Sequence, residues 1–264
     1  MDIINNENCP TLKELRKTWV VDVSDESIAI TGYKGKKTSE IVPVAIDTGK
    51  PIVSIGLGGN CDKILKEITL PEGLKTIEKC AFLPSAITKI NIPSTVKKIG
   101  KQAFSESAIR EITLPKTQKT VVEGLFWSCR NLEKIVLPTT IKKIGKSAFN
   151  DCLSLTEINF PVGLTTIGQS AFFRCFKLSD IQLPDTVTLI ELGTFEYCRA
   201  LEEIHLPPSI EEIKGSAFAN CTNLKKVIFN SENIQLGFEV FGKCPSLEFV
   251  GVEGGENLLP TLQK

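Results

Sequence analysis

The sequence has little of what most enzymes use. It has one histidine, His205, and no two cysteines at the C-x₂₋₄-C spacing of common metal sites. A Ser-His-Asp or Cys-His catalytic arrangement would have to be built around His205, which lies on an outward strand position. We therefore expect a protein that is not an enzyme and that uses no cofactor and no bound metal.

Net charge and long apolar runs are also missing. The chain has 31 Lys and Arg against 31 Asp and Glu, which excludes a general affinity for nucleic acid or anionic membranes but leaves local patches open. No apolar run approaches the ~18–20 residues of a membrane span. The N-terminus has no basic segment followed by an apolar one, so the sequence as given predicts a cytoplasmic protein.

A repeat of 22–23 residues dominates what is present. The pattern L-x-x-I-x-L-P-x-x-[VIL]-x-x-I-G-x-x-A-F-x-x-C recurs in phase, as in "LEKIVLPTTIKKIGKSAFNDC" from Leu132. The "EITLP"-type segments alternate polar and apolar residues and predict half-buried strands, which the proline ends. Stacking at a fixed period predicts a parallel sheet with turns ~4.8 Å apart and one buried Phe per turn.

A second extended piece, such as "TIKKIG", follows each proline and again alternates in burial. The "SAFNDC" piece then turns the chain back, and we expect it to form a single helical or 3₁₀ turn. Gly145-Lys146-Ser147 imitates the end of a phosphate-binding loop, but the required earlier glycine is replaced by Thr140. A nucleotide binder is therefore the least favoured hypothesis.

These repeats resemble the leucine-rich-repeat superfamily and are most similar to the bacterial BspA-type repeats, from about Ile41 to Val252. The resemblance implies an α/β horseshoe, a right-handed solenoid that is β-rich, has only short helical turns and carries a parallel sheet on its concave side. It brings no catalytic motif. It implies a binding module, with a surface or secreted location, because similar proteins are often surface proteins of host-associated bacteria. A bacterial adhesin for host matrix protein or glycan is the alternative function.

The domain organisation follows from the repeats. Residues 1–40 lie outside them and predict an N-terminal cap made of a short helix and a hairpin. Residues 41–264 form the solenoid, with an imperfect first turn at 41–64, eight clear turns at 65–246 and a terminal turn at 247–264. The partner of this surface is expected to be a protein.

Six cysteines recur one repeat apart, and Cys61 lies near the same place in the imperfect first turn: Cys129, Cys152, Cys175, Cys198, Cys221 and Cys244. A chain of disulfides or metal ligands is one interpretation. We favour the other, in which each cysteine is a small buried apolar side chain, because identical turns point their Cβ atoms in parallel.

Three surfaces are candidate binding sites. An acidic and polar patch on the concave side stacks like charges on successive turns, and it comprises Glu157, Asn159, Asp180, Gln182, Glu202, Glu203 and His205. Its carboxylates predict a cation or a basic partner, unless they form only a solvated stripe. A basic strip comprises Lys97, Lys98, Lys119, Lys142 and Lys143, and it fits an acidic polymer or simply keeps the surface soluble.

The third surface is aromatic. Trp127 and Phe173 each follow a buried Phe at a place where other turns carry Ser105, Asn150 and Glu196, so this place tolerates exposure to solvent. Phe176 and Tyr197 lie nearby. Exposed aromatic side chains are typical interface anchors, although packing between adjacent turns would explain them equally well.

Overall fold

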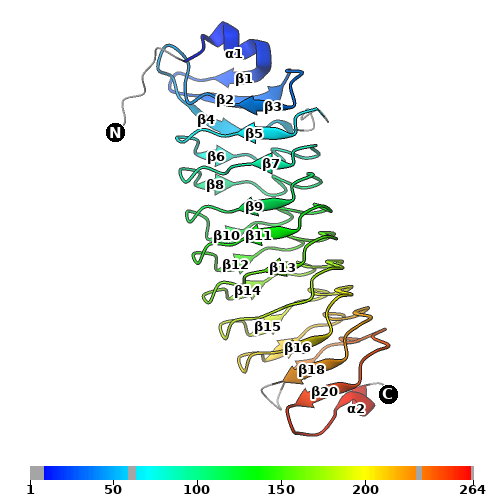
Figure 1. The fold of residues 1–264 in the computed structure, drawn as a ribbon. Coiled ribbons are helices and arrows are strands. Elements are labelled where there is room, and N and C mark those ends of the chain that lie inside the picture. The colour runs from blue at the N-terminus through cyan, green and yellow to red at the C-terminus, as the bar shows by residue number, and fades with distance from the viewer. Residues whose placement is uncertain (1–8, 59–63, 230–233, 263–264) are drawn as a thin grey trace.

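The computed structural model describes residues 9–58, 64–229 and 234–262 of the 264-residue chain. These residues form an elongated β-solenoid of about nine turns, with helix α1 (Leu12–Thr18) at one end and helix α2 (Leu259–Leu262) at the other (Figure 1). Most turns contribute two short strands, one at the place of the LP motif and one at the place of the IG motif, but the turn from Leu178 has no strand before Pro184. Cys61 lies outside the described residues.

The strands before the prolines run parallel and form what we call the LP face. They pair as β3-β5-β7, β9-β11-β13 and β16-β18-β20. Their bounds are β3 (Ser39–Ile41), β5 (Glu67–Thr69), β7 (Lys89–Ile90), β9 (Glu111–Thr113), β11 (Lys134–Val136), β13 (Glu157–Ile158), β16 (Glu203–His205), β18 (Lys226–Phe229) and β20 (Phe249–Val252).

The strands before the glycines form a second parallel face, which we call the IG face. They pair as β4-β6-β8, β10-β12-β14 and β15-β17-β19. Their bounds are β4 (Ile52–Ile55), β6 (Thr76–Ile77), β8 (Lys98–Ile99), β10 (Thr120–Val121), β12 (Lys143–Ile144), β14 (Thr166–Ile167), β15 (Leu189–Ile190), β17 (Glu212–Ile213) and β19 (Gln235–Leu236).

Two asparagines explain why some LP strands are short. Asn159 follows β13, and its side chain accepts a hydrogen bond from Leu137 N at 3.0 Å and donates one to Leu137 O at 2.9 Å. Asn91 follows β7 and makes the same pair of bonds to Leu70. The side-chain amide thus replaces a backbone pair, so the backbone ladder stops one residue early.

The core between the two faces contains a column of phenylalanine rings. Phe82, Phe104, Phe126, Phe149, Phe172, Phe195 and Phe218 are fully buried, and each stacks on the next at 5.2–5.6 Å between centroids. Isoleucine and leucine columns from both faces pack around it. A single turn could not bury such a ring on both sides, so the turns stabilise one another.

The expectation of a helical or 3₁₀ turn in the AF-x-x-C segment is wrong. In "GKSAFNDC" the amides alternate: Ala148 N donates back to Gly145 O at 3.3 Å, whereas Phe149 N donates to Ala171 O of the next turn at 2.8 Å. The segment forms consecutive turns instead of a helix, and Ser147 and Asp151 adopt positive φ values of 51° and 59°. Hydrogen bonds to the next turn satisfy polar groups that a helix would satisfy internally.

The N-terminal end combines a helix with an antiparallel pair of strands. Thr11 caps α1 in a capping box with Glu14. Strand β1 (Trp19–Val23) pairs antiparallel with β2 (Ile28–Tyr33), and β2 pairs parallel with β4 of the IG face. Because Leu15 and Trp19 are buried and belong to the same core cluster as the turns, we propose that the described part of residues 1–40 acts as a cap.

Candidate functional site

Three aromatic and two arginine side chains meet on the turns between β14 and β16. Phe173 and Tyr197 contact edge to face, with ring centroids 5.4 Å apart. The guanidinium of Arg199 lies 4.4 Å from the Phe176 centroid and 5.7 Å from that of Tyr197, and the Arg174 guanidinium lies 5.3 Å from the Phe176 centroid. We call these five residues the arginine–aromatic cluster. Its rings are half-buried and its arginines are exposed.

The repeat period brings these side chains together. Phe176 and Arg199 are 23 residues apart, so they occupy the same place on consecutive turns, and so do Arg174 and Tyr197. Arg174 and Tyr197 also have positive φ values of 60° and 64°. Other turns place Glu106, Ser128, Asp151, Asn220 and Lys243 there, all with positive φ, so the repeat imposes this backbone region on large side chains as well. Asn and Asp tolerate the region best.

The cluster carries a positive charge next to aromatic faces. Arg174 Nε pairs with Asp151 Oδ1 at 3.2 Å. Arg199 makes no ion pair within the described ranges, and its guanidinium lies against two aromatic rings. Cation–π contacts of this kind are worth about 0.5–1 kcal/mol when exposed and more when a partner desolvates them. The arrangement can therefore bind an apolar surface that also offers a carboxylate.

Trp127 does not join the other predicted aromatic residues. Hydrogen bonds place Asn150 between it and Phe173, because Ser128 N donates to Asn150 O and Asp151 N donates to Phe173 O on the following turn. Trp127 is half-buried, and no ring contact to it occurs among the residues with described positions. The predicted aromatic patch is thus reduced to Phe173, Phe176 and Tyr197 as one contiguous group.

The carboxylates of the acidic and polar patch are mostly paired with lysines of neighbouring turns. Lys134 lies 3.6 Å from Glu157, Lys225 lies 2.8 Å from Glu202, and Lys226 lies 3.8 Å from Glu203. Glu202 accepts a hydrogen bond from Lys225, which holds the pKa of this carboxyl below its usual value. These pairs lower the repulsion that the like charges would otherwise produce.

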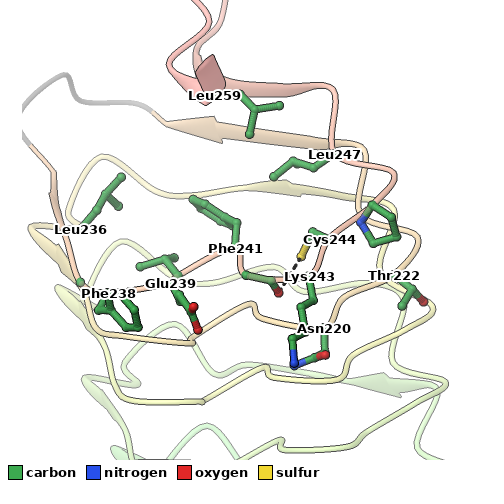
Figure 2. A pocket seen from close by; sticks show the side chains of 14 residues that line it. Asn220, Thr222, Leu236, Phe238, Glu239, Phe241, Lys243, Cys244, Leu247 and Leu259 are labelled. Carbon is green, nitrogen blue, oxygen red and sulfur yellow. Dashed lines mark hydrogen bonds between the residues drawn. The ribbon is translucent and has the colours of Figure 1, made fainter. Parts of the chain in front are cut away.

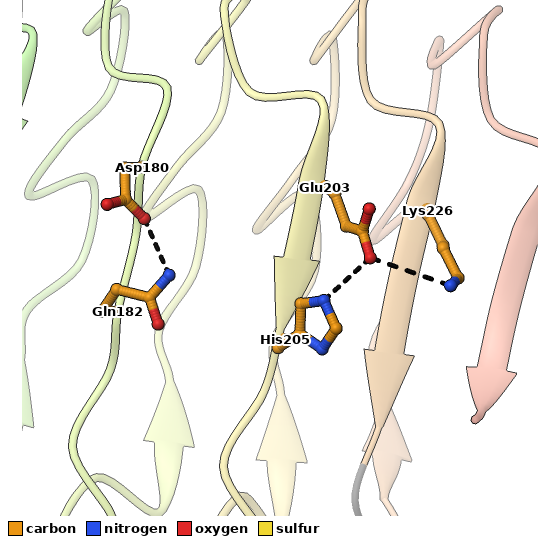
Figure 3. A network of polar contacts seen from close by, with 5 residues as sticks. All are labelled: Asp180, Gln182, Glu203, His205 and Lys226. Atoms are coloured by element: carbon orange, nitrogen blue, oxygen red, sulfur yellow. Dashed lines mark hydrogen bonds and ion pairs between the residues drawn. The ribbon is translucent and has the colours of Figure 1, made fainter.

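The remaining members of the patch contact one another. Gln182 donates a hydrogen bond to Asp180 at 2.8 Å, and His205 Nε2 lies 2.8 Å from Glu203 Oε1 (Figure 3). Asp180 is the only one of the four carboxylates without an ion pair to a described residue. The amide of Asn159 is already used to hold Leu137. The patch therefore leaves few polar groups free for a ligand.

The basic strip lies along the IG face. Lys98 and Lys143 begin β8 and β12, while Lys97, Lys119 and Lys142 precede strands of that face. All five side chains are exposed, and none makes an ion pair with a described residue. Lys142 N donates to Lys119 O at 2.8 Å, which places these two lysines on adjacent turns.

The six repeated cysteines are buried thiols that form no disulfide. Each donates a hydrogen bond to the carbonyl of the buried Phe of the preceding turn, as Cys175 does to Phe149 O at 3.2 Å. Burial raises the pKa of the Cys129 and Cys244 thiols to about 11. A thiol held protonated in this way is a poor nucleophile and a poor metal ligand.

The described residues contain no group of three or more His, Cys, Asp or Glu side chains arranged to hold a metal ion. Neither described helix is long and apolar enough to cross a bilayer.

Sequence reasoning found the aromatic members of the cluster but missed Arg174 and Arg199. The signal was present in "FFRCF" and "YCRA", where the period aligns Arg199 with Phe176. Comparing the same place on consecutive turns would have revealed it. The comparison that identified Phe173 considered how polar its place is on other turns, and it did not ask which side chains of consecutive turns face each other.

Comparisons with known proteins identify the repeats. Residues 59–135 and 119–248 match the BspA type leucine rich repeat region, in six copies. No curated protein matches the chain. A leucine-rich repeat protein of T. pallidum is 26% identical over 88% of each chain, with a TM-score of 0.47. The pneumococcal vaccine antigen PcpA is 18% identical over 87% of this chain and 78% of its own, with a TM-score of 0.52, a likeness of fold.

Proposed function

We propose, because the chain belongs to the BspA-type leucine-rich repeat family, that it is a non-enzymatic interaction module that binds a protein partner. Solenoids of this kind expose extended surfaces built from side chains that recur on every turn. The right-handed horseshoe, with its LP face on the concave side, belongs to the same proposal. The acidic and polar patch, the basic strip and Trp127 stay predicted binding residues.

The arginine–aromatic cluster is the observation that carries the proposal. Interface residues that dominate binding are enriched in Trp, Tyr and Arg, and they lie in packed groups that a partner can desolvate. Tyr197 and Arg199 share one contact network with Phe173 and Phe176. The free charge on Arg199 points to a partner segment that carries a carboxylate beside an apolar side chain.

The backbone conformation of Tyr197 allows the effects of this residue on stability and on binding to be separated. Tyr197 has a positive φ of 64° at a place where Asn220 follows on the next turn with a φ of 60°. Keeping a tyrosine in this region costs about 1–2 kcal/mol relative to a favourable conformation. We expect Tyr197→Asn to leave the fold at least as stable as before and to weaken partner binding.

The test uses a photo-reactive residue at position 176 in the protein expressed in its source cells. A matched probe replaces Val162, a side chain outside the cluster that is 81% exposed. We expect position 176 to capture a protein that position 162 does not. Calorimetry with the captured protein then compares Arg199→Ala with Arg130→Ala, which occupies the same place three turns earlier.

Removing a central interface arginine costs at least 1–2 kcal/mol, so Arg199→Ala should weaken binding by about fivefold to thirtyfold. Arg130→Ala should leave the affinity unchanged. Equal affinities of the two variants would contradict the assignment to this cluster. Capture of a glycan by the cluster, with no protein, would contradict the partner class.

A further inference from the structure

The described residues cover the last turn of the solenoid on one half. On the LP side, residues following β20 cover its edge: Leu258 N donates to Val250 O at 2.7 Å, and the Asn257 side chain bonds Val250 N at 3.0 Å and Glu248 O at 2.9 Å. Beside this cover, a pocket of about 960 Å³ opens between the last turn and α2. Leu236, Phe238, Phe241, Leu247 and Leu259 line it (Figure 2).

The apolar wall of this pocket consists of the last side chains of the isoleucine–leucine and phenylalanine columns of the core. Ile213 and Phe218 are fully buried on the preceding turn, whereas Leu236 and Phe241, at the same places on the last turn, are only half-buried. Phe241 stacks on Phe218 with centroids 5.9 Å apart, and it lines the pocket. Phe238 is 81% exposed at the rim. The pocket therefore presents the surface that one further turn would cover.

The last turn also has backbone amides that lack an acceptor among the described residues. On the preceding turn, Ser216 N, Phe218 N and Asn220 N donate to carbonyls of the last turn at 3.0, 2.9 and 2.7 Å. The equivalent amides of the last turn belong to Glu239, Phe241 and Lys243. Among the described residues these three amides have no acceptor, and all three residues line the pocket.

We propose that this open half-end captures an extended peptide segment of another protein, which adds to the solenoid as an extra turn. The segment must offer carbonyls on three alternate residues. In the stack, Phe195 N donates to Ala217 O, and the residue after Ala217 places its ring on Phe195. The captured segment therefore has a small residue followed by an aromatic residue, whose ring covers Phe241.

A second copy of this chain does not fit the same surface. Two copies meeting at their C-terminal ends would bring amide donors against amide donors and leave both sets unpaired. The opposite end of a copy is also unsuitable, because α1 and β1 pack there with Leu15 and Trp19 buried. A peptide that pairs through its backbone and inserts an aromatic side chain satisfies both requirements. The proposal uses none of the residues of the arginine–aromatic cluster.

The test uses the intact protein and a synthetic peptide with the sequence of residues 167–174, IGQSAFFR. Calorimetry should show saturable one-to-one binding with a Kd on the order of 10 μM to 1 mM. Hydrogen exchange followed by NMR should slow by about tenfold or more at the amides of Glu239, Phe241 and Lys243. The peptide that carries Phe172→Ala should bind at least about tenfold more weakly.

Protein variants distinguish binding at this site from nonspecific binding of the peptide. Phe241→Ala keeps its amide but removes the ring, and it should weaken peptide binding by about tenfold or more. Val162→Ala changes a side chain that is 81% exposed outside the pocket and should bind as the parent does. An unchanged circular dichroism spectrum establishes that Phe241→Ala is folded, and hydrogen exchange of the parent reads the same site without any substitution.

Three results would overturn the proposal. They are no saturable binding up to about 5 mM peptide, equal binding of the Phe172→Ala peptide, and exchange protection at amides elsewhere than in the last turn. Sedimentation equilibrium supplies a fourth: a dimer that protects the three amides without peptide would assign the surface to a second copy.

Discussion

Replacing Phe149 by alanine tests whether the column of phenylalanine rings stabilises the solenoid. The Phe149 side chain is fully buried, and its ring stacks on Phe126 at 5.5 Å and on Phe172 at 5.2 Å. Alanine removes the ring from both stacks in the middle of the array. The rigid columns on either side cannot collapse into the space without breaking the hydrogen bonds between turns.

The expected loss follows from two contributions. Burying a phenylalanine side chain contributes about 1.5–3 kcal/mol, and the cavity left by the ring adds to that loss. Phe→Ala in a core costs about 3–5 kcal/mol in total. Domains are typically stable by only about 5–15 kcal/mol, so Phe149→Ala should remove a large fraction of the free energy of unfolding.

Equilibrium unfolding in urea, followed by circular dichroism, measures this loss. We expect the midpoint to fall by roughly 1–2 M. Phe149→Leu, which nearly conserves volume, should cost less, about 1.5 kcal/mol or below. Phe238→Ala is the matched control because its ring is 81% exposed, and it should change stability by no more than about 0.5 kcal/mol. An unchanged midpoint for Phe149→Ala, or a shift equal to that of Phe238→Ala, would refute the stacked-core reasoning.

Three further substitutions test the turns and the buried polar contacts by the same urea assay. Ser147→Val should cost about 1–2 kcal/mol because Ser147 has a φ of 51°, and a loss no larger than that of Ser147→Gly would contradict this. Asn159→Ala should cost about 1–2 kcal/mol, since Leu137 loses both of its hydrogen bonds to that side chain; no change would show that water replaces them. The pKa of Cys129 rises on folding from its ordinary value of 9.0 to about 11, so the unfolded chain releases this proton first as the pH rises. The contribution of this thiol to the free energy of unfolding is fully present below about pH 9, and it falls by roughly 2–3 kcal/mol towards pH 11. Cys129→Ala should remove that share of the loss of stability at alkaline pH.

The sequence predicts the strands well because their determinants are local and recur. The alternation in "EITLP" and the proline that follows place the LP strands, and the alternation in "TIKKIG" places the IG strands. The turns escaped prediction for a physical reason. Their positive φ values are set by hydrogen bonds between turns, and the residues at these positions, such as Ser147 and Arg174, have no shared chemical type. Gly58, Gly124 and Gly193, at the place of Ser147, hint at the backbone conformation.

The candidate site was predictable only in part. Exposure of Phe173 follows from the polar residues at its place on other turns, but contacts of Arg199 require a comparison across two turns. The acidic and polar patch shows the opposite effect. Its like charges in the sequence predict a binding site for a cation or a basic partner, yet Glu157 and Glu203 each lie beside a lysine of a neighbouring turn. In both the arginine–aromatic cluster and the acidic and polar patch, the contacts depend on which side chains of neighbouring turns pair. The pattern of residues along the sequence does not show this pairing.

The affinity of the captured protein partner for Arg199→Ala, compared with Arg130→Ala, tests the central claim most directly. Both substitutions remove an exposed arginine from the same place in the repeat, but only Arg199 contacts aromatic rings. We predict that Arg199→Ala binds about fivefold to thirtyfold more weakly than the parent protein, while Arg130→Ala binds as the parent does. Equal affinities for the two variants would show that the partner binds elsewhere on the solenoid.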